Sequence, residues 1–201
     1  MRIIGITGPS GAGKGLVSEI LCKEYGFHAI DADKVYHALV SSPSDCLVEI
    51  QKHFGEEVVD KNGALNRAIL RELVFGKENS DKLELLNKIT HKHVMRAIRT
   101  EIECLDPNIK ACIVDAPLLI EAGFIPECDL TISVIAQADI RADRISKRDD
   151  ISMADAIKRI SSQKPDSFYL DNTDYHVTND DDIEALTRSL REIINERRVN
   201  T

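Results

Sequence analysis

The chain has 201 residues, 43% of them hydrophobic and 30% charged, which is the balance of a globular protein with a single core. Its 26 Lys and Arg residues against 34 Asp and Glu give a net charge of −8, which argues against broad electrostatic binding to nucleic acid or to an anionic membrane. No apolar run approaches the ~20 residues that span a bilayer, and the N-terminus lacks a signal-peptide pattern. We therefore expect no nucleic-acid or membrane partner, and any phosphate must be bound locally.

The cysteines are five in number, widely spaced and without a Cys-x-x-Cys pair. An odd, scattered set of this kind is typical of reduced thiols and argues against a disulfide framework or a zinc site. We therefore expect a cytoplasmic protein.

Short apolar runs predict strands at residues 2–7, 27–31, 111–115 and 129–135. Helical patterns separate them, as in an α/β fold whose parallel sheet is covered on both faces. The first helix is expected to begin near Lys14 and to end at Gly26, a residue suited to a helix C-cap.

Residues 33–105 form a second region, which is helical in pattern and is broken by the turn Asp60-Lys61-Asn62-Gly63. Apolar residues after Ser80 keep to one face of a long helix, so this region is expected to be a helical lobe inserted into the core. An Arg-rich helical stretch follows at 138–164, and Asp180-Asp181-Asp182 is expected to cap a last helix.

The segment Gly8-Pro9-Ser10-Gly11-Ala12-Gly13-Lys14 has the G-x-x-x-x-G-K spacing of a phosphate-binding loop, placed between a predicted strand and a predicted helix. Glycines let successive backbone N–H groups converge on phosphate oxygens, and the lysine reaches the β- and γ-phosphates. The alternative is a glycine turn with a surface lysine. The residues expected to bind nucleotide are Gly8, Ser10, Gly11, Ala12, Gly13, Lys14, Gly15 and Leu16.

One position departs from this motif. A Ser or Thr normally follows the lysine and binds Mg²⁺ through its hydroxyl, but this chain has Gly15. The Gly-Lys-Gly sequence resembles that of adenylate kinases, although those usually continue with Thr where this chain has Leu16. We expect Mg²⁺ to reach the protein mainly through water.

Beyond the loop, a series of short motifs follows in a specific order. They are Asp31-Ala32-Asp33, His53-Phe54-Gly55, Asp60 to Gly63 with Leu65 and Arg67, Leu70-Arg71, Val74-Phe75, Leu86-Asn87, Ile89-Thr90-His91, Asp115 with Pro117-Leu118-Leu119 and Glu121, Arg144, Arg148-Asp149, Arg159-Ile160, Gln163 and Asn179. In their order and spacing the sequence resembles the dephospho-coenzyme A kinases over nearly its whole length. This resemblance implies ATP-dependent phosphorylation of the ribose 3′-hydroxyl of dephospho-CoA, with Mg²⁺, on a P-loop kinase fold with a parallel five-stranded sheet.

The resemblance also implies a three-part organisation within a single P-loop kinase domain, residues 1–201. The core would comprise residues 1–33, 108–137 and 166–201, the helical acceptor-binding lobe residues 34–107, and an Arg-rich lid residues 138–165.

The candidate catalytic residues fit phosphoryl transfer, which depends on positioning and charge stabilisation. Lys14 would contact phosphate, and Asp33, just past a predicted strand, would accept or orient the proton of the acceptor hydroxyl. The alternative for Asp33 is a helix cap, a role that suits Asp31 better. Arg144 and Arg148 would close over the triphosphate, whereas a solvated position accounts for Arg141.

Asp115 ends an apolar run, the position of a Walker B carboxylate, and with Asp33 it is the expected metal partner, through water. The alternative is a strand-end carboxylate that binds backbone N–H groups. His91 matches a motif position where Pro usually follows, but Lys92 follows here, so the helix is expected to continue.

Two other functions remain open from the sequence. Gly-Lys-Gly and the three-part layout also suit a nucleoside monophosphate kinase, and the missing hydroxyl suits a nucleotide-binding module of reduced activity. The middle lobe argues against the first, and the presence of Lys14, Asp33, Asp115 and Arg148 against the second. The oligomeric state is not predicted.

Overall fold

The computed structural model describes residues 1–74 and 79–199, so Phe75 of the sequence motifs lies outside the described residues. The chain divides into two compact units. We call Met1–Ile30 with Leu105–Thr201 the core unit, and Asp31–Cys104 the helical unit.

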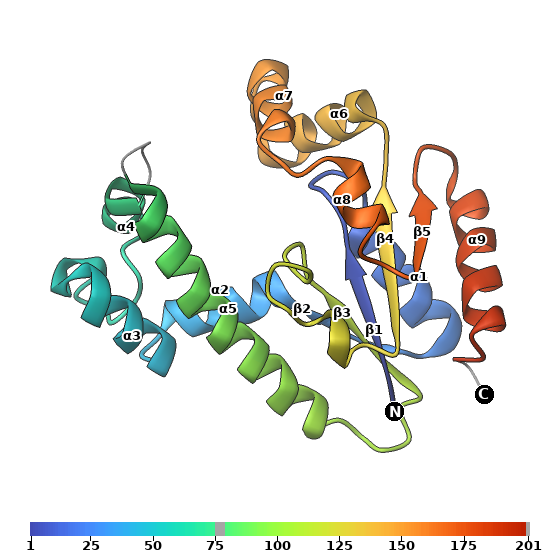
Figure 1. Ribbon diagram of the computed structural model, residues 1–201, viewed down its shortest axis with the longest axis horizontal. Helices are drawn as coiled ribbons and strands as arrows, with labels where there is room; N and C mark the ends of the chain where they lie inside the picture. The colour runs from blue at the N-terminus through green and yellow to red at the C-terminus, as the bar shows by residue number, and fades with distance from the viewer. Residues whose placement is uncertain (75–78, 200–201) are drawn as a thin grey trace. The chain divides into compact units, whose positions relative to one another are not determined.

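The core unit is built on a five-stranded sheet in the order β2-β3-β1-β4-β5 (Figure 1). The strands are β1 (Arg2–Thr7), β2 (His28–Asp31), β3 (Ala111–Asp115), β4 (Leu130–Ile135) and β5 (Tyr175–Thr178). β1 pairs in parallel with β3 and β4, and β4 pairs in parallel with β5. The parallel α/β sheet expected from the sequence is confirmed, with the first four strands within a residue of their predicted bounds.

The strands are apolar because both faces of the sheet are covered. β3 and β4 have the burial pattern of central strands, with nearly every residue buried. A Cβ on Gly5 of β1 would lie 2.6 Å from Leu119 Cδ2 and 2.8 Å from Cys128 Sγ. The segment after β3 therefore packs directly on the middle of the sheet.

Five helices and a short 3₁₀ turn accompany the sheet among the described residues of the core unit. They are α1 (Lys14–Tyr25), α6 (Ala138–Asp149), α7 (Met153–Ser161), α8 (Asp166–Leu170), α9 (Ile183–Glu196) and the 3₁₀ turn η3 (Ile125–Glu127). Side chains of α1 and α9 share one apolar cluster with β1, β4 and β5. α1 ends at Gly26 with φ 68°, and the Asp182 carboxylate accepts from the Ala185 N–H at the start of α9, as the sequence predicts.

The direction of winding of the sheet changes at β1. The chain passes from β1 to β2 and β3 on one side of it and then crosses to β4 and β5 on the other. Open α/β sheets bind ligands where the direction of winding changes, at the carboxyl ends of the strands. The loop after Thr7 lies at this point, and Figure 1 shows α6 and α7 beyond the same end of β4.

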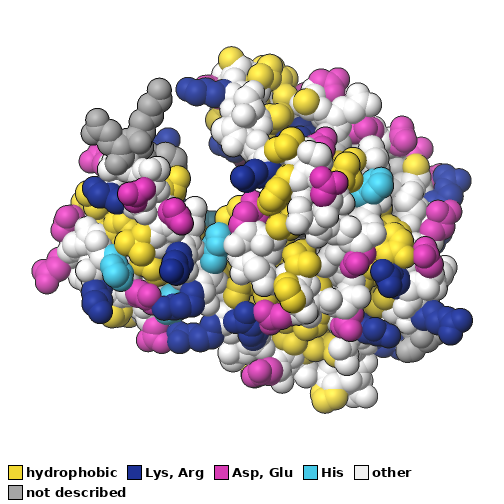
Figure 2. Space-filling model, in the orientation of Figure 1, with side chains coloured by type: hydrophobic (Ala, Val, Ile, Leu, Met, Phe, Trp, Pro, Cys, Tyr) yellow, Lys and Arg dark blue, Asp and Glu magenta, His cyan; other side chains and the backbone are white. Residues whose placement is uncertain are grey.

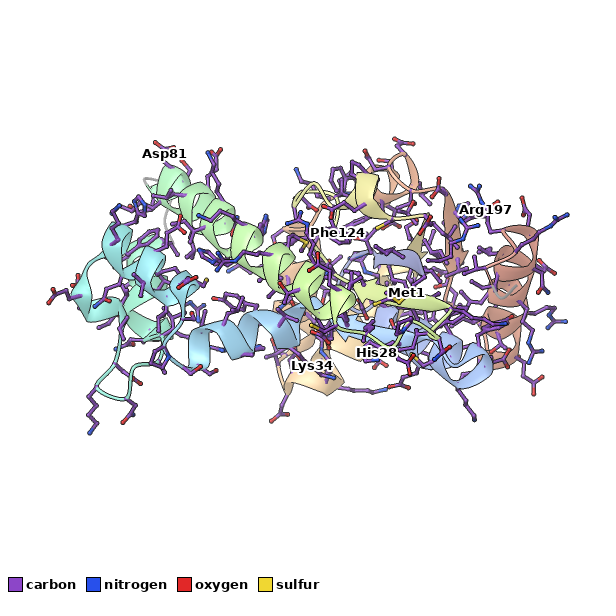
Figure 3. All side chains as sticks on the ribbon, turned by 90° about the horizontal axis from the view of Figure 1, so that it is seen from below. Met1, His28, Lys34, Asp81, Phe124 and Arg197 are labelled. Atoms are coloured by element: carbon purple, nitrogen blue, oxygen red, sulfur yellow. The ribbon has the colours of Figure 1, made fainter. Side chains whose placement is uncertain are left out.

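The helical unit consists of α2 (Ala32–Ser41), α3 (Asp45–Phe54), a 3₁₀ turn η1 (Glu56–Val58), α4 (Arg67–Val74) and α5 (Ser80–Glu103). α5 packs against α2, α3 and α4, and Figure 3 shows Asp81 at its beginning. The unit has its own apolar cluster, which includes Leu47, Ile50 and Ile89. α5 runs without a break through Lys92, which confirms the expected continuous helix.

Charged side chains of both signs are interspersed on the face shown in Figure 2. Among the described residues, no helix is long and apolar enough to cross a membrane.

Candidate active site

The phosphate loop joins β1 to α1 as the sequence predicts, and its glycines are required by the backbone. Gly8, Gly11 and Gly13 have φ of 140°, 80° and 97°, a region that side chains rarely adopt. A Cβ on Gly8 would lie 2.2 Å from the Val134 carbonyl oxygen, and one on Gly13 would lie 2.1 Å from Asn179 Nδ2. The loop is therefore held tightly between its neighbours, with a conformation that only glycine allows.

Lys14 lies at the first position of α1 and its side chain folds back over the loop. Its Nζ donates to the Gly8 carbonyl at 2.9 Å and to the Pro9 carbonyl at 3.3 Å. The ammonium group is therefore held beside the loop backbone, at the positive end of the α1 dipole.

Asn179 supports the loop from the end of β5. Its side chain is 4% exposed, and Nδ2 donates to the Ala12 carbonyl at 2.8 Å. Its backbone N–H donates to the Ile135 carbonyl. The sequence singles out Asn179 only through the resemblance, because the contact joins residues 167 positions apart.

Helix α6 meets the loop through three arginines, one of which corrects a prediction. Arg141, expected at the surface, is 4% exposed. Its Nε donates to the Ser10 carbonyl at 3.0 Å, Nη2 to Gln163 Oε1 at 2.6 Å, and Nη1 lies 3.4 Å from Asp166 Oδ1. The helical spacing of Arg141 could not reveal this, because the first turn of α6 packs on the loop itself: a Cβ on Gly11 would lie 2.8 Å from the Arg141 carbonyl oxygen.

Burial lowers the pKa of the Arg141 guanidinium from its usual value, and the nearby carboxylate of Asp166 opposes that shift. Arginine remains charged because its ordinary pKa is above 12. Arg141 is therefore a buried cation that ties the loop to the segment before α8.

The other two arginines reach the loop from the exposed side of α6. Arg144 Nη1 lies 3.4 Å from the Gly11 carbonyl, and Arg148 Nη2 lies 3.4 Å from Ser10 Oγ. Arg148 also donates to both oxygens of Asp149, at 2.7 and 3.0 Å, and Arg159 pairs with the same carboxylate. The hydrogen bond from Arg148, with that from Arg159, lowers the pKa of Asp149 to about 2.

Asp115 ends β3, beside Ile6 of β1 in the sheet register. Its Oδ2 lies 3.2 Å from the hydroxyl of Ser18, one turn into α1. The Thr7 hydroxyl donates to the Pro117 carbonyl and fixes the segment after β3 to the end of β1. Ser18 was not predicted from the sequence, since it lies outside the loop motif.

In the helical unit, Asp31 is the better helix cap of the two aspartates, as the sequence suggests. The Asp31 carboxylate accepts from the backbone N–H groups of Asp33 at 3.0 Å and Lys34 at 3.1 Å, so it is the N-cap of α2. Asp33 lies in the first turn of α2 with an exposed side chain. Its carboxylate is not the one that caps the helix.

Lys92, the departure noted beside His91, has a defined partner. Its Nζ donates to both oxygens of Glu49 on α3, at 2.7 and 2.6 Å, and the buried His93 lies 2.6 Å from Glu49 Oε2. The hydrogen bonds from Lys92 and then His93 lower the pKa of Glu49 to about 2. This cluster joins α3 to α5 and has the geometry of a structural contact.

Known proteins resemble this chain along nearly its whole length. Residues 2–185 match the family model described as "Dephospho-CoA kinase". The chain is 36% identical over 190 residues to the dephospho-CoA kinase of Fusobacterium nucleatum, covering 94% of this chain and 95% of that protein. It is 35% identical over 198 residues to the dephospho-CoA kinase of Dehalococcoides mccartyi, covering 98% of each.

Solved structures are similar too. Dephospho-CoA kinase from Campylobacter jejuni superposes with a TM-score of 0.68 at 26% identity, covering all of both chains. Shikimate kinase from Acinetobacter baumannii superposes with a TM-score of 0.56 at 14% identity, which shows a shared fold.

Proposed function

Because this chain belongs to the dephospho-CoA kinase family, we propose that it transfers the γ-phosphate of ATP to the ribose 3′-hydroxyl of dephospho-CoA, which yields coenzyme A and ADP. The observation that carries the use of ATP is the loop: three glycines with positive φ, fixed on both sides, with Lys14 folded over them. The choice of acceptor is supported by the family match over residues 2–185. The five free thiols support a cytoplasmic location.

The loop residues Gly8, Ser10, Gly11, Ala12, Gly13, Lys14, Gly15 and Leu16 would bind the nucleotide phosphates. Backbone N–H groups at the start of α1 and the Lys14 ammonium offer positive charge to the phosphate oxygens. In phosphoryl transfer most of the rate enhancement comes from positioning the reactants. The rest comes from donors and cations, already fixed in place, that stabilise the charge developing in the transition state.

The chain's donors fit Mg²⁺. The described residues hold no cluster of three His, Cys, Asp or Glu side chains that could enclose a metal. Mg²⁺ keeps several waters and is usually bound through one or two carboxylates and the substrate's phosphates. Asp115, with Asp33 as the second candidate, would hold the ion in this way. When bound, Mg²⁺ would neutralise charge on the phosphate oxygens.

Asp33 would accept or orient the proton of the acceptor hydroxyl. A carboxylate suits this step because it can orient the hydroxyl before transfer and take its proton as the new P–O bond forms. Arg144 and Arg148 would act on the triphosphate as lid residues, with residues 138–165 as the lid and residues 34–107 as the acceptor-binding lobe. When nucleotide binds, Arg148 would leave Asp149 and bind phosphate instead. The Arg148 side chain is 60% exposed, which leaves space for this change of partner.

The direct test is product identification. The purified protein is incubated with ATP, Mg²⁺ and dephospho-CoA, and ADP and coenzyme A are separated by chromatography. We expect equal amounts of the two products, with the new phosphate on the ribose 3′-oxygen by mass spectrometry. ADP without coenzyme A would contradict the proposal, and Asp33→Asn provides the control for a contaminating kinase.

A further inference from the structure

The position after the loop lysine has room for a side chain but carries none. A Cβ built on Gly15 would meet no atom within 4 Å. The absence of a hydroxyl there is therefore not imposed by crowding in the core unit.

Ser18, one helical turn further on, faces the carboxylate of Asp115. Its side chain is buried, with 6% exposed, and its Oγ lies 3.2 Å from Asp115 Oδ2 and 3.2 Å from the Lys14 carbonyl oxygen. The hydroxyl has one proton and two acceptors, and the charged carboxylate is the stronger of the two. The bond joins α1 to the end of β3, two elements that pack against each other.

This arrangement suits an orienting group. A carboxylate at the end of a strand can rotate about its terminal bond, and each donor that bonds it narrows that rotation. Groups that hydrogen-bond a metal-binding carboxylate orient it, and their loss typically weakens metal binding by about 10–100-fold.

We propose that Ser18 is a positioning residue for the metal–nucleotide site, which fixes the Asp115 carboxylate and so compensates for the hydroxyl that Gly15 lacks. The inference rests on the proposed use of Mg·ATP and adds to it a residue outside the loop motif. Ser18 acts on the metal through Asp115 and does not itself touch the nucleotide.

The test measures the effect of Mg²⁺ on ATP binding, without turnover. The dissociation constant of ATP is determined by calorimetry with EDTA and with excess Mg²⁺, and the ratio of the two values is the Mg²⁺ enhancement. For Ser18→Ala we expect the ratio to fall about tenfold, with the value in EDTA unchanged. Ser189→Ala is the control, since the Ser189 hydroxyl also donates to the carbonyl four residues earlier but lies exposed on α9, outside the loop and the segments that contact it.

A second comparison uses the space at position 15. Adding Gly15→Ser to Ser18→Ala is expected to restore most of the enhancement, because it supplies a hydroxyl beside Lys14. If Ser18→Ala does not fold, Ser18→Cys keeps the shape with a weaker donor and is expected to lower the ratio as well. An unchanged ratio in the folded variant would overturn the role of Ser18, whereas absence of ATP binding by the natural protein in either buffer would overturn the proposed function itself.

Discussion

At the scale of single residues, the two aspartates at the start of α2 differ in what their carboxylates contact. The Asp31 carboxylate is engaged by the backbone of Asp33 and Lys34, and the exposed Asp33 carboxylate lies outside that cap. A residue needed for helix stability and one available to a substrate therefore stand two positions apart.

Asp33→Asn is expected to lower kcat by about 10²–10⁴-fold, because it removes a positioned carboxylate and keeps its shape. ATP should still bind, and its affinity measured by calorimetry in EDTA should stay the same, since Asp33 is proposed to act on the metal and the acceptor. Asp31→Asn is the matched control, since Asn is as good an N-cap as Asp and should keep both stability and turnover. A near-normal kcat for Asp33→Asn would leave Asp33 with no part in the reaction.

Much of the loop could be predicted from the sequence, because its chemistry is local. The spacing of Gly8, Gly13 and Lys14 determines both the turn and its place before a helix. Ser18 and Arg141 could not be found in this way, since their partners Asp115 and Ser10 lie 97 and 131 residues away. Only the packing of α1 and α6 on the sheet brings these pairs together.

At the scale of elements, α6 contacts the loop through one buried arginine, one half-buried arginine and one exposed arginine. Arg141 has three partners and 4% exposure, whereas Arg148 contacts the Ser10 hydroxyl and Asp149 from the surface. The same helix thus supplies a buried structural cation and an exposed one.

Arg148→Ala is expected to lower kcat more than it weakens ATP binding, because a lid cation acts chiefly on the state in which charge develops. Its free energy of unfolding should change little. Arg141→Ala should instead destabilise the protein by about 2–4 kcal/mol, since it removes a buried side chain and leaves three half-buried acceptors without its hydrogen bonds. Steady-state kinetics and urea unfolding measure the two effects, and a rise in KM alone for Arg148→Ala would show simple ground-state binding.

The contact between α3 and α5 predicts a pH dependence of stability. Glu49 has its pKa lowered to about 2 by Lys92 and His93, whereas a free glutamate titrates near 4.5. The folded form therefore binds the proton less tightly, and the stabilisation is complete above pH 4.5 and is lost as the pH falls toward 2.

Glu49→Gln should flatten the acid limb of the unfolding free energy in this range and leave the alkaline limb unchanged. Thermal unfolding of both proteins at a series of pH values measures this pH dependence of stability. Asp45→Asn is the control, because Asp45 also joins α3 to α5, through Arg96, but both of these side chains are exposed. An acid limb as steep in Glu49→Gln as in the natural protein would show that the cluster contributes nothing.

At the scale of the whole molecule, the fold class was predictable and parts of the topology were not. Apolar runs predict four strands, but in β5 polar His176 and Thr178 alternate with Tyr175 and Val177, so no apolar run marks this strand. The helical unit has its own apolar cluster, separate from that of the core unit. P-loop kinases share the fold of the core unit, so the acceptor that each one phosphorylates distinguishes their functions.

The measurement that tests the central claim most directly is acceptor choice. ADP release is followed with dephospho-CoA, AMP, CMP and shikimate in turn, and kcat/KM is compared at the same Mg·ATP concentration. We expect dephospho-CoA to exceed each other acceptor by at least about a hundredfold, which corresponds to about 2.7 kcal/mol of transition-state binding. Equal or greater kcat/KM with AMP or CMP would contradict the assignment and favour a nucleoside monophosphate kinase.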